Sequence, residues 1–103
     1  MFQQFSSHGF GRGAKVDYAI IGASALDQDG DLLDFDLPEV RVSRAIIRQS
    51  RQVFLVTDAS KLERSAPVRL ASLSEIDVVF TDIAFPEQLN KNCQEWNTEI
   101  RIA

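Results

Sequence analysis

Short apolar runs separated by polar segments dominate the chain from residue 16 onward. Residues 16–22, 53–57 and 77–81 are rich in β-branched and aromatic side chains, and runs of this length are typical of buried strands. Residues 69–73 are predicted to be a further short extended piece, followed by one helical turn at residues 74–76. Three buried strands therefore form the expected centre of the fold.

Two longer segments have the pattern of helices. The first covers residues 38–51, where a proline suits the first turn, an acid follows it, and no breaker occurs further on. The second covers residues 86–96, where apolar residues recur at a spacing of three and four: Leu89, Cys93 and Trp96.

The end of the chain returns to a strand pattern, because residues 98–102 alternate so that Ile100 and Ile102 face inward. Strands that alternate with helices indicate an α/β fold with a parallel sheet and right-handed crossovers. Residues 1–14 follow neither period, and we expect them to form an irregular lead-in.

Asp58 and Lys61 follow directly after the strand expected at residues 53–57. They therefore lie at the carboxyl end of a parallel strand, which is the edge where open parallel sheets bind ligands. A lysine at that edge is well placed to contact an anion. A surface lysine that caps a turn fits the same spacing.

Four arginines lie along one edge of the helix expected at residues 38–51. At 100° per residue they fall within about 80° of one another: Arg41, Arg44, Arg48 and Arg51. This edge is either a solvated face beside apolar neighbours or a contributor to an anion site.

Composition limits the class of protein. The 103 residues are 45% apolar and 25% charged, as in one soluble globular domain. The net charge of -4 argues against a chain built to coat nucleic acid. Residues 41–69 nevertheless hold seven cations and two anions, so an anion site would be local.

Several kinds of site are excluded or not expected. Cys93 is the only cysteine, which rules out an intrachain disulfide and a cysteine-based zinc site and fits a cytoplasmic location. The acidic segment around Asp29 and Gly30 lacks the glycine and glutamate spacing of a calcium loop and is expected to be a turn. We find no signal peptide, no membrane span and no pattern of a catalytic centre, so we expect no metal, cofactor or membrane contact.

Three stretches taken in order resemble the effector-sensing domain of DeoR-family transcriptional repressors. They are Val-Asp-Tyr-Ala-Ile-Ile-Gly at residues 16–22, Leu-Asp-Phe-Asp-Leu-Pro-Glu-Val-Arg-Val-Ser-Arg-Ala-Ile-Ile at 33–47, and Val-Thr-Asp-Ala-Ser-Lys at 56–61. The resemblance covers residues 15–103 and implies the C-terminal half of a three-layer sensor, related in fold to ribose-5-phosphate isomerase and the CoA transferases. It implies a phosphorylated sugar or polyol as effector, with glycerol-3-phosphate expected.

The resemblance also implies a set of ligand-binding residues. By likeness, the effector pocket is lined by Gly22, Ser24, Glu39, Arg44, Asp58, Ser60 and Lys61. A lysine point charge and an arginine fork suit a phosphate, while a carboxylate suits polyol hydroxyls. Many family members have an acid where Ser24 stands and a lysine where Ser43 stands, so isomerase-type proton chemistry is not expected.

The leading hypothesis is the sensing portion of a repressor that is not an enzyme. No helix-turn-helix pattern is found, so we expect no direct DNA binding by this chain. One alternative is an oligomerisation module or a remnant without ligand binding, and a second is a fragment of a sugar-phosphate isomerase-like enzyme. A homo-oligomer is expected, with Tyr18, Ile20 and the phenylalanine-bearing start as participants.

Overall fold

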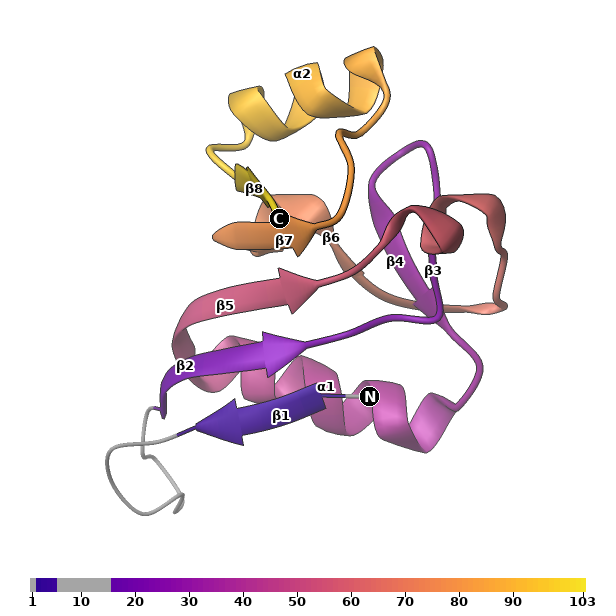
Figure 1. Ribbon diagram of the computed structural model, residues 1–103. Coiled ribbons are helices and arrows are strands. Elements are labelled where there is room, and N and C mark those ends of the chain that lie inside the picture. Colours follow the sequence, from indigo (N-terminus) through magenta and orange to yellow (C-terminus); the bar gives the residue numbers. More distant parts are fainter. Residues whose placement is uncertain (1, 6–15) are drawn as a thin grey trace.

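The strands of the chain form two sheets, which the computed structural model describes for residues 2–5 and 16–103 (Figure 1). The larger sheet has the order β1-β2-β5-β7-β8. Its strands are β1 (Phe2–Phe5), β2 (Val16–Ile21), β5 (Ser50–Val56), β7 (Val78–Thr81) and β8 (Glu99–Ile102). Strands β2, β5, β7 and β8 run parallel, whereas β1 pairs with β2 in the antiparallel sense. The four parallel strands confirm the predicted α/β fold.

The extended piece predicted at residues 69–73 is confirmed as one strand of a smaller antiparallel sheet, whose other two strands were not predicted. Its strands, in the order β3-β4-β6, are β3 (Ala25–Leu26), β4 (Asp31–Asp34) and β6 (Val68–Ser72). In the turn between β3 and β4, Asp27 Oδ1 accepts hydrogen bonds from the backbone N–H groups of Asp29 (3.0 Å) and Asp31 (2.8 Å). Gly30 has a φ of 86°, a conformation that favours glycine. The acidic segment is thus a tight turn, as its sequence predicts.

Helices connect the strands of both sheets. The α-helices are α1 (Leu37–Gln49) and α2 (Glu87–Glu95), and the 3₁₀ helices are η1 (Ala59–Glu63) and η2 (Leu73–Glu75). Helix α1 begins after Asp36, whose side chain accepts a hydrogen bond from the backbone N–H of Glu39 (3.3 Å). Both α-helices end within two residues of their predicted bounds. None of the described helices has the length and apolar content needed to cross a lipid bilayer.

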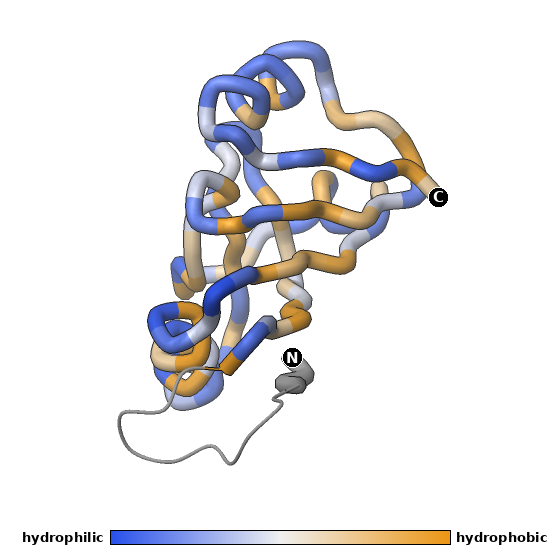
Figure 2. Tube along the Cα trace, turned by 90° about the vertical axis from the view of Figure 1, so that its left-hand side faces the viewer, coloured by the Kyte–Doolittle hydropathy of each residue, from blue (hydrophilic) through white to orange (hydrophobic). Residues whose placement is uncertain are grey.

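The core lies between one face of the larger sheet and the layer formed by α1, α2 and the smaller sheet (Figure 1). Its largest contributors are Ile21, Leu55 and Val79 from the larger sheet, Leu26, Leu32 and Leu70 from the smaller one, Val40 and Ile47 from α1, and Leu89 and Cys93 from α2. Apolar, orange stretches are concentrated in the stacked strands of Figure 2, whereas α2 is mostly blue. Helix α2 therefore covers the core with a narrow apolar stripe.

The opposite face of the larger sheet carries an aromatic row and has no described helix in front of it (Figure 1). Tyr18, Phe54 and Phe80 lie on three neighbouring strands, with ring centroids 5.9 Å and 6.0 Å apart. The Arg101 guanidinium lies 5.8 Å from the centroid of the Phe80 ring. Tyr18 is 38% exposed and Val56 is 54% exposed, so apolar surface on this face is open to solvent.

The two ends of the chain differ from the sequence expectation. Residues 2–5 form strand β1, so the prediction of an irregular lead-in is wrong for these residues. Residues 1 and 6–14 lie outside the described residues. At the other end β8 forms as predicted, but Ile102 is 55% exposed because β8 is the last strand of its sheet.

Candidate functional site

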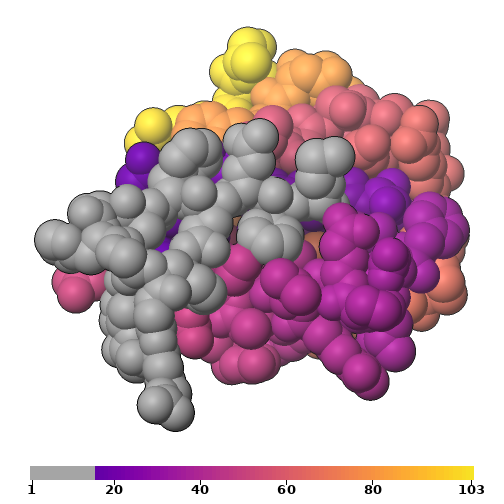
Figure 3. Space-filling model, turned by 90° about the horizontal axis from the view of Figure 1, so that it is seen from below, coloured from indigo at the N-terminus to yellow at the C-terminus, as the bar shows by residue number. Residues whose placement is uncertain are grey.

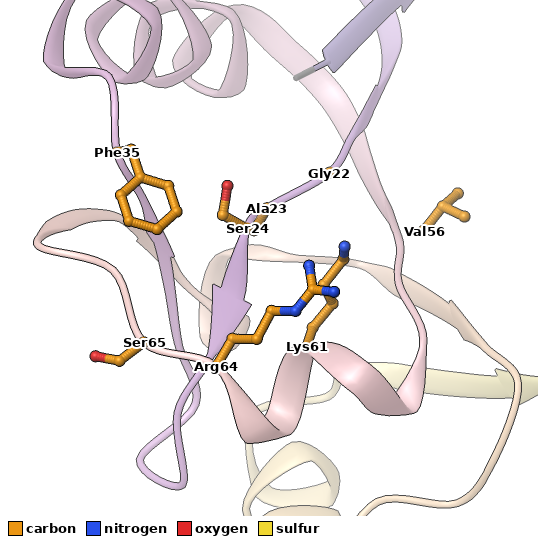
Figure 4. A pocket seen from close by; sticks show the side chains of 8 residues that line it. All are labelled: Gly22, Ala23, Ser24, Phe35, Val56, Lys61, Arg64 and Ser65. Carbon is orange, nitrogen blue, oxygen red and sulfur yellow. The ribbon is translucent and has the colours of Figure 1, made fainter.

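A cavity of about 540 Å³ lies at the carboxyl ends of β2 and β5 (Figure 4). Its walls come from the segment after β2, the end of β5 with η1 beyond it, and the loop after β4. The lining residues are Gly22, Ala23, Ser24, Phe35, Val56, Lys61, Arg64 and Ser65. Parallel strands bring their carboxyl ends to one edge, where open parallel sheets bind ligands, and the volume suits a small molecule.

The 3₁₀ helix η1 carries Lys61 to the cavity, and Asp58 fixes the start of that helix. Asp58 Oδ1 accepts hydrogen bonds from the backbone N–H of Ser60 (2.9 Å) and from the Ser60 hydroxyl. These bonds hold the pKa of the Asp58 carboxyl below its usual value, and the charges of Lys61 and Arg64 act in the same direction. Asp58 and Ser60 thus bind each other and position the lysine that follows them.

A second tie holds η1 against the neighbouring strand. The backbone N–H of Ala59, the first residue of η1, donates a hydrogen bond to Asp82 Oδ1 (2.9 Å), directly after β7. The backbone N–H of Thr57 donates to Phe80 O (2.9 Å). The turn that presents Lys61 is therefore anchored to two strands of the parallel sheet.

Ser24 is oriented by the smaller sheet. Its hydroxyl donates a hydrogen bond to Asp34 Oδ1 (2.9 Å), and its backbone N–H donates to Leu33 O (3.0 Å). Asp34 Oδ1 also accepts from the backbone N–H of Phe35 (2.8 Å). The two sides of the cavity that carry Ser24 and Phe35 are thus fixed to each other through one carboxylate.

Two cations line the cavity without a carboxylate partner. The ion pairs among the described residues involve other cations: Arg44, Arg69, Lys91 and Arg101. Lys61 and Arg64 form none of these pairs. Figure 4 shows both side chains extending from η1 toward the segment at residues 22–24. A concave surface with two cations free of carboxylate partners is chemically suited to an anion.

The two α1 residues named by likeness do not line this cavity. Arg44 Nη1 instead donates a hydrogen bond to Leu70 O (2.7 Å), and its Nη2 lies 3.5 Å from Glu75 Oε1. Arg44 therefore ties α1 to β6 and η2. Glu39 is exposed in the first turn of α1. Of the seven residues expected from the resemblance, the lining contains Gly22, Ser24 and Lys61.

A second cavity, of about 460 Å³, lies between the turn after β3, η1 and the start of α2, and no lysine or arginine lines it. Seen from below in Figure 3, α1 in magenta forms much of the surface, and Arg41 and Arg48 are exposed there. Cys93 is fully buried and burial raises the pKa of its thiol to about 11, which confirms a core residue. The described residues contain no group of three or more His, Cys, Asp or Glu side chains that would hold a metal ion.

Sequence reasoning missed five lining residues: Ala23, Phe35, Val56, Arg64 and Ser65. Arg64 had a detectable signal, because it stands three residues after Lys61 and side chains three apart lie on one edge of a 3₁₀ helix. No periodic signal marks Phe35, which lies in the loop between β4 and α1.

The comparisons with known proteins bear on this site. The model of one protein family, described as the DeoR C terminal sensor domain, matches residues 2–83. This match spans the described parts of β1 and every residue that lines the cavity. The match begins at residue 2, whereas the resemblance found in the sequence begins at residue 15.

Curated relatives share the same region. The glycerol-3-phosphate regulon repressor of Haemophilus influenzae is 46% identical over 86 residues, which are 84% of this chain and 33% of that protein. Its Escherichia coli counterpart is 50% identical over 72 residues, 70% of this chain and 29% of that protein. The HTH-type transcriptional repressor CsqR of Escherichia coli is 30% identical over 84% of this chain and 33% of its own length. The chain spans about a third of the length of these relatives.

Proposed function

The chain belongs to the DeoR C-terminal sensor domain family, and on that premise we propose that it senses a phosphorylated sugar or polyol as part of a transcriptional repressor. Glycerol-3-phosphate is the first effector to test, because two relatives are named as repressors of its regulon. The proposed role is ligand binding without chemical conversion of the ligand.

The observation that carries this proposal is the cavity with Lys61 at the carboxyl ends of β2 and β5. The carboxyl edge of a parallel sheet, a cation without a carboxylate partner among the described residues and nearby hydroxyls are the features that suit a small phosphorylated polyol. The Ser24 and Ser65 hydroxyls offer hydrogen bonds to ligand hydroxyls. Phe35 and Val56 supply apolar wall.

The remaining residues expected from the resemblance have supporting roles in this proposal. Asp58 and Ser60 hold η1 so that Lys61 faces the cavity. Gly22 lets the backbone after β2 approach a ligand, since it has no side chain. Arg44 holds α1 against β6, and Glu39 places an acid in the first turn of α1, where it stabilises the helix.

A thermal-melt series tests the proposal. We expect glycerol-3-phosphate at millimolar concentration to raise the Tm of the chain, because a ligand that binds only the folded state stabilises it. Glycerol at the same concentration should leave the Tm unchanged. Lys61→Ala should abolish the shift, since a hydrogen bond to a charged group contributes roughly 1.5 to 3 kcal/mol.

The matched control is Lys91→Ala. Lys91 is exposed on α2, where it pairs with Glu87 at 3.3 Å, and it lies outside the cavity lining. This variant should keep the full shift. Calorimetry that detects no binding of glycerol-3-phosphate or of other sugar phosphates to the unaltered chain would overturn the proposed function.

Self-association is a second proposal, and the face of the larger sheet that no described helix covers favours it. Tyr18 and Ile20, which sequence analysis named as participants, both lie on this face beside Phe54. A second copy of the same surface covers such a face most simply through a two-fold axis. Phe10, from the phenylalanine-bearing start, lies outside the described residues.

A further inference from the structure

We propose that Lys61 and Arg64 together form a two-cation clamp for the phosphoryl group of the ligand, with Arg64 as the specificity-determining partner. This inference rests on the proposed function and deepens it, because it states which end of the ligand faces η1. It also replaces Arg44, which only the family resemblance placed in the pocket, by an arginine from a different element.

The local geometry of η1 brings the two side chains to one edge. Arg64 caps the C-terminus of η1, and its backbone N–H donates to Lys61 O at 3.4 Å. In a 3₁₀ helix three residues complete one turn, so side chains at positions i and i+3 lie one above the other. Figure 4 shows the result, with both side chains directed from η1 toward residues 22–24.

Both cations of this edge are available to a ligand. Asp58 is close enough for the charges of Lys61 and Arg64 to lower the pKa of its carboxyl. Its Oδ1, however, accepts hydrogen bonds from Ser60. Glu63 stands between the two cations in the sequence and is exposed, and neither Lys61 nor Arg64 forms an ion pair with it or with another described residue.

The donors of this pair match a phosphate monoester. Such a group carries close to two negative charges near pH 7 and three acceptor oxygens. Arg64 presents a planar fork that binds two oxygens, and Lys61 adds a point charge with three donors. The phosphoryl group would thus lie against η1, and the hydroxyl-bearing part would lie toward the Ser24 hydroxyl and Phe35.

The Arg44 guanidinium, unlike that of Arg64, already has partners within the fold. Its guanidinium binds Leu70 O at 2.7 Å and approaches Glu75 at 3.5 Å, so releasing it for a ligand would leave a backbone carbonyl without this donor. Arg64 is exposed, and its side chain forms no hydrogen bond with another described residue. Changing Arg64 should therefore alter binding and leave the fold intact.

The test measures glycerol-3-phosphate affinity by calorimetry for the unaltered chain and four variants. Arg64→Gln should weaken binding roughly 10- to 100-fold, as expected for one charge-assisted contact. Arg64→Lys should recover part of that loss. Arg44→Gln should lower the Tm of the unliganded chain while leaving the dissociation constant within about twofold. Arg48→Gln, an exposed arginine on α1, is the neutral control.

Inorganic phosphate serves as a second probe for the same variants. If Arg64 contacts the phosphoryl group, Arg64→Gln should weaken phosphate and glycerol-3-phosphate binding by similar factors. Unchanged affinity of Arg64→Gln for both probes, with binding intact in the unaltered chain and lost in Lys61→Ala, would overturn the clamp and leave the sensor function standing. Absence of binding in the unaltered chain would instead overturn the proposed function.

Discussion

At the residue scale, both the backbone conformation of Gly30 and its contact with Trp96 favour glycine at this position. Its φ of 86° is unfavourable for other residues, and an added Cβ would lie 2.9 Å from Trp96 Cζ3 and 3.0 Å from Cη2. We expect Gly30→Ala to lower the free energy of unfolding by about 1–3 kcal/mol. Urea unfolding followed by fluorescence of Trp96, the only tryptophan, measures this.

The matched control for this change is Asp29→Ala in the same turn. Asp29 is exposed, and its backbone N–H rather than its side chain bonds to Asp27. Its unfolding midpoint should stay close to that of the unaltered chain. Equal midpoints for Gly30→Ala and Asp29→Ala would show that the turn relaxes around the new methyl group.

Cys93 gives a second prediction at this scale. Burial raises the pKa of its thiol from 9.0 to about 11, so the neutral thiol is favoured in the folded chain. The resulting stability is fully present below about pH 9 and is lost as the pH rises toward 11. Urea unfolding at pH 8 and pH 10.5 should therefore show an alkaline loss that Cys93→Ala reduces.

Thiol reactivity provides an independent readout of the same burial. Because the thiolate is the reactive form and the side chain is fully buried, a disulfide reagent should react slowly with the native chain and rapidly in denaturant. Similar rates under both conditions would contradict the burial of Cys93.

At the element scale, the role of Asp58 as the N-cap of η1 predicts different ligand affinities for two of its substitutions. Asp58→Asn keeps an oxygen that accepts the Ser60 N–H bond, so η1 should still present Lys61 and phosphate affinity should be retained or improved by loss of the nearby negative charge. Asp58→Ala removes the cap and should weaken glycerol-3-phosphate binding. Similar weakening of binding in Asp58→Asn and Asp58→Ala would instead point to a direct carboxylate contact with ligand hydroxyls.

The pH dependence of this cap follows from its lowered pKa. Hydrogen bonds from Ser60 favour the ionised carboxyl of Asp58 in the folded chain. Its contribution to stability is therefore present above the ordinary aspartate pKa and is lost as the pH falls through the lowered folded value. The free energy of unfolding should therefore fall less at acid pH in Asp58→Ala than in the unaltered chain, as urea unfolding at a series of pH values would measure.

The elements also show what the sequence reveals and what it does not. Buried parallel strands and amphipathic helices leave a local apolar pattern, so β2, β5, β7, α1 and α2 were predictable. The smaller sheet was not, because β3 has two residues and β4 pairs with β6 more than thirty residues later. Strand β1 follows no local period that distinguishes it from the glycine-rich residues beyond it.

The candidate site was likewise predictable from the sequence only in part. The position of Lys61 follows from a strand end, which is a local feature. The position of Arg44 depends on the carbonyl of Leu70, a partner twenty-six residues away that no helical pattern reveals. Arg64 was missed because the sequence predicts no helix directly after residues 53–57, and the spacing of three from Lys61 indicates a shared edge only once a helix forms there.

At the scale of the whole molecule, the larger sheet has one face on the core and one face that carries apolar side chains without a described helix over them. The face includes Tyr18, Ile20, Phe54, Val56, Val78 and Phe80. Monomeric proteins seldom leave contiguous apolar patches larger than a few hundred Å² in water. An isologous contact between two such faces would cover both of them.

We therefore expect sedimentation equilibrium at micromolar concentration to give an average mass above the 11.5 kDa of the single chain. Tyr18→Lys places a charge on the uncovered face and should return the mass to that of the monomer, because pairing would bury the ammonium group. Val42→Lys is the matched control, since Val42 is 51% exposed on α1 and should not affect association. A monomer of 11.5 kDa for the unaltered chain at high concentration would contradict self-association. Ligand binding tested on the same sample would then be a property of the single chain, because the cavity is lined entirely by residues of one copy.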